Sequence, residues 1–98
     1  MLYMIKRVCK DSGKVEFRKA GLYESESLWN KNGKCWTSIG AIKGMLCHDI
    51  GYPRGHKKTA MSIIEDNDNF DLYLIEIDIV NETVTSQPFI EWVKENIE

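Results

Sequence analysis

The stretch that decides the fold is F-D-L-Y-L-I-E-I-D-I-V, residues 70–80. It is rich in β-branched and aromatic residues, and it alternates in polarity as a strand does. Its apolar residues fall into two sets on opposite faces: Phe70, Leu72 and Leu74, then Ile75, Ile77 and Ile79. A β-bulge between Leu74 and Ile75 would return all six to one face. Without a bulge, the strand is covered on different faces along its length, and in either case we expect it to be central.

The segments that follow this strand predict a second hairpin and a closing helix. Asn81-Glu82 forms a turn into a last strand over residues 83–86. Pro88 can begin a helix, because the N–H that proline lacks is not needed there. Residues 89–97 then place apolar side chains at helical spacing on one side.

The N-terminal residues predict a first hairpin. Residues 2–9 are rich in β-branched and aromatic types, and residues 15–18 alternate between apolar and charged types. Between them, residues 10–13 form a turn in which Gly13 can take a positive φ. These four strands are joined largely by hairpins.

The middle of the chain predicts a loop and one or two helices. Residues 19–34 form a loop with a short extended piece near Leu28-Trp29. Thr37 or Ser38 can cap a helix that Gly51 and Pro53 terminate. Gly40 and Gly44 within this helix suggest close approach of another backbone or a ligand. Residues 57–66 fit a short helix or a strand, and we favour the helix.

The element order is therefore β-β-α-(α)-β-β-α. It predicts an α+β fold in which helices pack on a small antiparallel sheet of about four strands. A chain of 98 residues is the size of one domain, so we expect a single domain over residues 1–98.

Composition and charge bound the class of protein. No apolar run approaches the ~20 residues that cross a bilayer, and no signal peptide is evident, so we expect a cytoplasmic protein without membrane contact. Three cysteines fit free thiols better than a disulfide framework.

Charge is distributed unevenly along the chain. Residues 1–58 carry 12 Lys or Arg and 5 Asp or Glu, a net charge of +7, and residues 59–98 carry 1 Lys and 10 Asp or Glu, a net charge of −9. The halves either present opposite electrostatic faces or neutralise each other across the sheet.

Metal and catalytic patterns are weak. Cys35, Cys47, His48 and His56 lack the paired spacings of structural zinc sites, so no metal or cofactor is expected. Cys47 and His48 are adjacent and do not share a helix face, which disfavours a nucleophile and base. A small nuclease or hydrolase using His48 or His56 with a carboxylate is the weakest of the functions considered.

A basic loop over residues 52–58 is the candidate ligand site. It places several cations and an aromatic ring beside a possible helix start, where phosphate of a nucleotide or nucleic acid would bind. Lys43 and the ring of Trp36 would extend this surface by stacking. The candidate binding residues are Trp36, Lys43, Tyr52, Arg54, His56, Lys57 and Lys58. An ordinary solvated loop is the competing interpretation.

Residues 33–43, G-K-C-W-T-S-I-G-A-I-K, are similar to a G-K-x-W-x-x-x-G-x-x-K pattern of short bacteriophage proteins of unassigned role. In those proteins the pattern follows a β-hairpin and precedes a strand rich in Ile and Glu, which here correspond to residues 2–19 and 74–78. The resemblance implies a phage or prophage origin and an accessory role in the host cytoplasm. It supplies no catalytic residue.

Together these features favour a non-enzymatic binding protein that acts on a host protein. The alternative is a nucleic-acid or nucleotide binder that uses the basic loop. An exposed strand edge offers a possible route to a homodimer.

Overall fold

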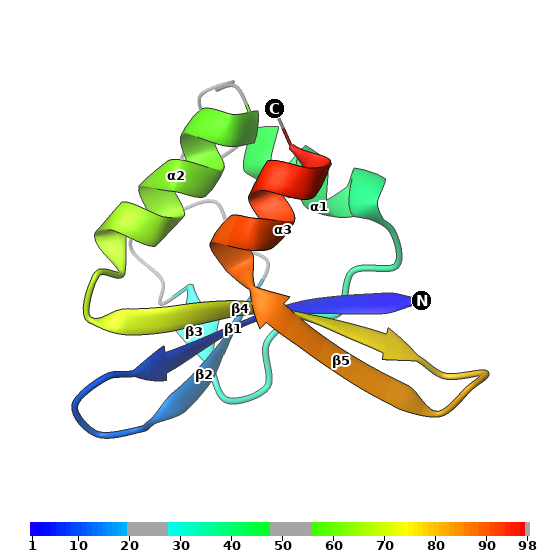
Figure 1. Ribbon diagram of the computed structural model, residues 1–98, viewed down its shortest axis with the longest axis horizontal. Coiled ribbons are helices and arrows are strands. Elements are labelled where there is room, and N and C mark those ends of the chain that lie inside the picture. Colours follow the sequence, from blue (N-terminus) through cyan, green and yellow to red (C-terminus); the bar gives the residue numbers. More distant parts are fainter. Residues whose placement is uncertain (20–27, 48–55, 98) are drawn as a thin grey trace.

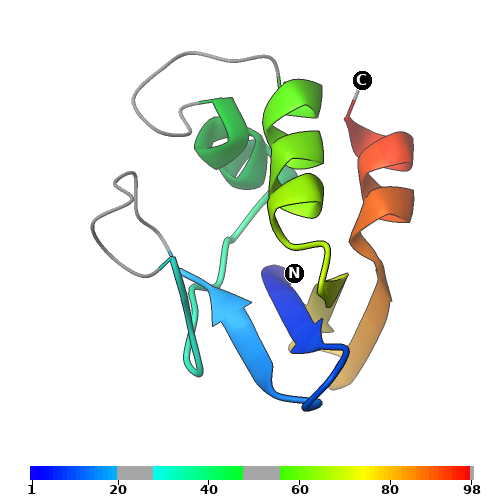
Figure 2. The same ribbon diagram turned by 90° about the vertical axis from the view of Figure 1, so that its left-hand side faces the viewer.

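A computed structural model describes residues 1–19, 28–47 and 56–97. Five antiparallel strands form one sheet in the order β3-β2-β1-β4-β5, and three helices lie on one of its faces (Figures 1 and 2). The elements are β1 (Leu2–Cys9), β2 (Val15–Arg18), β3 (Trp29–Asn30), α1 (Ile39–Cys47), α2 (His56–Asp66), β4 (Phe70–Asp78), β5 (Thr83–Pro88) and α3 (Phe89–Asn96). The predicted α+β fold is confirmed.

The two predicted hairpins are present, with small differences at their ends. In the β1–β2 turn, Gly13 has φ +74° and its N–H donates to the Cys9 carbonyl. β4 ends at Asp78, two residues earlier than predicted, because the Asp78 carboxylate accepts bonds from Asn81 N and Nδ2 and shapes the turn. The short extended piece near Leu28-Trp29 becomes β3, which adds a fifth strand to the predicted four.

No bulge interrupts β4. Its pairing with β1 is continuous from Leu2 opposite Ile77 to Cys9 opposite Phe70. Leu74 and its partner Ile5 are fully buried under the helices. Since side chains alternate along a strand, Ile75 and Ile77 point to the other face of the sheet. Of the two alternatives for this strand, the one without a bulge is correct.

The core lies between the sheet and the helices. Ile5 and Leu74 come from the sheet, and Trp92 of α3 is fully buried against them. Removing such apolar surface from water contributes about 1.5–3 kcal/mol per large side chain. The buried cluster is completed by Trp29, Trp36, Ile42, Leu46, Ala60, Ile63, Phe89, Val93 and Ile97.

The middle of the chain forms two helices. The favoured helix over residues 57–66 is confirmed as α2. Ser38, one of two predicted caps, accepts a hydrogen bond from Ala41 N (3.0 Å) at the start of α1. No described backbone approaches the α1 glycines closely: a Cβ at Gly44 would meet nothing within 4 Å, and one at Gly40 only Ser38 Oγ at 3.8 Å. Close approach of a ligand at these glycines stays a prediction.

Candidate functional site

The residues predicted to bind a ligand are placed differently from one another. Lys43 is half-buried on α1. Tyr52 and Arg54 lie outside the described residues. His56, Lys57 and Lys58 form the start of α2, which begins at His56, one residue before the helix favoured from the sequence. No single described surface therefore unites the predicted set.

Trp36 is the clearest correction to the predicted site. Its side chain is only 3% exposed and belongs to the core cluster. The cause is an isolated bridge in which Trp36 and Tyr3 exchange both backbone hydrogen bonds (2.8 Å each). This pairing extends the sheet beside β1 and turns the indole under the helices. Trp36 therefore offers no exposed ring for stacking and acts as a core residue.

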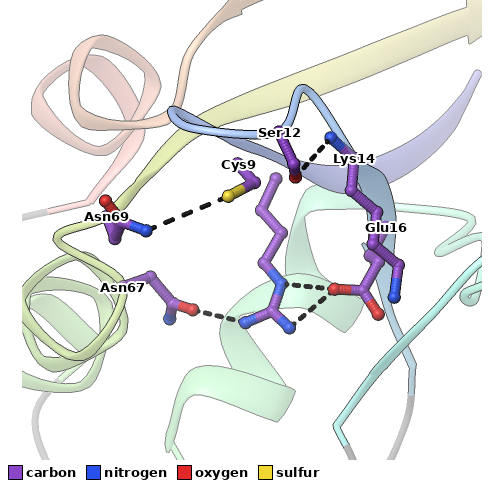
Figure 3. Close-up of polar contacts among 7 residues, drawn as sticks. Cys9, Ser12, Lys14, Glu16, Asn67 and Asn69 are labelled. Carbon is purple, nitrogen blue, oxygen red and sulfur yellow. Dashed lines mark hydrogen bonds and ion pairs between the residues drawn. The ribbon is translucent and has the colours of Figure 1, made fainter.

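A polar cluster on the helix side of the sheet ties β1 to β2 and α2 (Figure 3). Arg7 donates to Glu16 Oε1 from Nε (3.2 Å) and Nη2 (2.8 Å), and from Nη1 to Asn67 Oδ1 (2.7 Å). Asn67 Nδ2 in turn donates to the Ile63 carbonyl (2.8 Å). The Arg7 guanidinium also lies 4.1 Å from the Phe70 ring centroid and 4.7 Å from that of Trp29. These contacts occupy the guanidinium, so we interpret the cluster as structural.

The β1–β2 turn holds a cysteine in an unusual setting. The Ser12 hydroxyl, followed by the backbone N–H groups of Ser12 and Asp11, hydrogen-bonds the thiolate and lowers the pKa of Cys9 below its ordinary value. Asn69 Nδ2 lies 3.9 Å from the sulfur on the far side (Figure 3). Sequence reasoning overlooked Cys9, although its position directly before a serine-containing turn is a usable signal.

The second face of the sheet is covered by none of the described helices. The helices lie on the opposite side in both views (Figures 1 and 2). Strand register arranges the side chains of this open face in rows across the sheet. The rows are Val15, Val8 and Asp71; Phe17, Lys6, Tyr73 and Pro88; Met4, Ile75 and Ser86; and Leu2, Ile77 and Val84. We call these residues the open face.

The open face is predominantly apolar and becomes more exposed toward its edges. Ile75 at its centre is 8% exposed because its strand neighbours shield it. Val84 is 66% exposed and Val15 43% exposed at opposite corners. Lys6 places Nζ 5.1 Å from the Tyr73 ring centroid, so the cation lies over an aromatic ring of the same face. Contiguous exposed apolar surface of this kind is often used for binding.

The sequence carried a signal for this surface. The change of apolar phase after Leu74 places Ile75 and Ile77 on the face away from the core. A strand covered on both faces would show the same change, so the pattern alone does not indicate an open face. The pattern could not indicate that all three helices pack on a single face.

Metal-binding and acid–base groups are sparse among the described residues. Within them no group of three or more His, Cys, Asp or Glu residues could hold a metal ion. A hollow of about 250 Å³ over β4 and β5 is lined by Leu74, Glu76, Thr85, Ser86 and Gln87. Glu76 is the one titratable side chain among these lining residues, so the hollow supplies no acid–base pair. None of the described helices is both long enough and apolar enough to span a membrane.

The open face is thus an apolar sheet surface that none of the described helices covers. Comparison with protein-family models, with curated proteins and with solved structures found no match for the chain.

Proposed function

We propose that this protein is a non-enzymatic interaction module that binds another protein through its open face. The observation that carries the proposal is a sheet whose helices all lie on one side, leaving apolar rows from Leu2 to Val84 on the other. Covering such a surface removes apolar area from water, which is the dominant favourable term in protein association. The pattern shared with short phage proteins adds a host-cell component as an expected partner.

Two neighbouring residues of β5 provide a matched test. Val84 points to the open face, whereas Thr85 pairs with Glu76 on the helix side, and both are exposed. The tagged chain, its Val84→Lys variant and its Thr85→Lys variant would each be used to capture partners, which are then identified and quantified by mass spectrometry. We expect a stoichiometric partner, another protein or the chain itself, that Val84→Lys loses and Thr85→Lys retains. Equal capture by both variants would refute the role of the open face.

Nucleotide or nucleic-acid binding is a second candidate, and the start of α2 favours it. The helix begins at His56, so Lys57 and Lys58 stand in a first turn that contains no acidic residue. The free N–H groups of a helix start attract anions. Fluorescence anisotropy with short DNA and RNA tests this function. Affinity should fall steeply with salt and weaken in a Lys57→Ala/Lys58→Ala variant, and binding unchanged by either would exclude it.

A further inference from the structure

We propose that the protein bound at the open face is a second copy of this chain, in a two-fold dimer whose sheets pack face to face. The inference rests on the proposed function, because it names the partner of the same surface. A two-fold dimer uses one patch twice, so the patch must complement itself in size, polarity and charge.

The size of the open face suits a dimer. Each of the thirteen residues of the open face occupies about 4.8 Å across the strands and about 6.7 Å along them, which gives a plane of about 420 Å² on each copy. Two copies therefore cover about 840 Å² of plane, and the relief of the side chains raises the buried accessible area above that value. Specific protein–protein interfaces bury at least about 1,000 Å² of accessible surface in total. The open face reaches this range only when most of its rows are covered together, as another flat sheet would cover them.

The polarity of the open face also resembles that of homodimer interfaces. Transient interfaces are about as polar as the remaining protein surface, whereas homodimer interfaces are more apolar. The two rows at the Leu2 end of the face, from Met4 to Ser86 and from Leu2 to Val84, contain no charged side chain. A face of this composition resembles the interior of a sandwich between two sheets.

Charge does not oppose self-association. The strand residues of the open face carry two charged side chains, Lys6 and Asp71, which are of opposite sign. The Lys6 ammonium lies over the Tyr73 ring of the same face, a favourable cation–π contact. Two identical open faces therefore meet with no net charge on either one. Packed sheets lie about 10 Å apart with strands rotated by about 30°, and the helices remain outside on both copies.

Sedimentation velocity over rising concentration, from about 1 to 200 µM, tests the inference on the full chain. We expect a species of twice the 11.3 kDa chain mass that dissociates on dilution. Val84→Lys should raise the dimer dissociation constant at least tenfold, and Thr85→Lys less than twofold. Val15→Lys, at the opposite exposed corner, should act like Val84→Lys, because one interface spans both corners. Circular dichroism confirms that each variant remains folded.

The outcomes separate this inference from the proposed function. A wild-type chain that stays monomeric at every concentration overturns the dimer, while an identified partner lost only in Val84→Lys retains the proposed function. A monomer with no partner that depends on the open face overturns both. A dimer that survives Val84→Lys and Val15→Lys also overturns the inference, since its interface then lies elsewhere, for example along the β5 edge.

Discussion

Replacing Arg7 should destabilise the fold, because its charge is shielded from water and paired with that of Glu16. Its side chain is 17% exposed, as is that of Glu16, so the pair is shielded but not fully removed from water. Breaking a buried pair by removing one partner costs about 3–5 kcal/mol, and the remaining exposure lowers this figure to about 2–4 kcal/mol. We use Arg7→Met, because methionine keeps an unbranched apolar side chain and removes the guanidinium, with its hydrogen bonds and its contacts to the Phe70 and Trp29 rings.

Urea unfolding followed by tryptophan fluorescence measures this loss. Arg7→Lys should be intermediate, about 1–2 kcal/mol, because a lysine keeps the charge but not the planar fork that bonds Glu16 and Asn67 together. A double-mutant cycle of Arg7→Met with Glu16→Gln should give a coupling of about 1–3 kcal/mol. Lys10→Met, at an exposed position, is the control and should change stability by less than about 0.5 kcal/mol. An Arg7→Met cost as small as that of the control, or a coupling near zero, would refute the reasoning.

Two further predictions concern the turns. Gly13 and Gly33 both have positive φ, but a Cβ at Gly13 would meet nothing within 4 Å, whereas one at Gly33 would collide with Phe17 Cβ. Gly13→Ala should lower the free energy of unfolding by about 1–2 kcal/mol, from the left-handed backbone alone. Gly33→Ala should lower it by about 1–3 kcal/mol more, because the added methyl group overpacks the site. Equal losses of stability in thermal unfolding would contradict the placement of Gly33. At Cys9, hydrogen bonds that favour the thiolate lower the pKa of the thiol. The midpoint of the pH–rate profile for alkylation by iodoacetamide should therefore rise in a Ser12→Ala variant. Peptide-level mass spectrometry follows that rate, the urea-unfolded chain is the control, and an unchanged midpoint would show that Ser12 has no influence on the thiol.

Local patterns predicted most of the secondary structure. The alternation of residues 70–78 and the turns at Gly13 and Asn81 indicated β4 and both hairpins, because these features depend on neighbouring residues only. The same holds for the serine cap of α1 and the apolar spacing of α2. β3 was suggested only as an extended piece, since two residues carry little pattern of their own.

Features that depend on distant contacts were beyond the sequence. Trp36 looked like a surface ring, and only its bridge to Tyr3 shows why it is buried. No role was predicted for Arg7, because its contacts depend on Asn67, which is 60 residues away. The open face exists because all three helices pack on the same side of the sheet. That arrangement depends on the packing of the whole core, so no single segment of the sequence predicts it.

The central claim is that the open face is a binding surface. The most direct measurement is NMR of the methyl groups of Met4, Ile77 and Val84 with a soluble paramagnetic agent, on the chain at rising concentration or saturated with an identified partner. We predict that these methyls lose their paramagnetic relaxation on binding, while the helix-side methyl of Thr85 keeps its own. Methyls of the open face that remain equally relaxed in the free and the bound chain would contradict the claim.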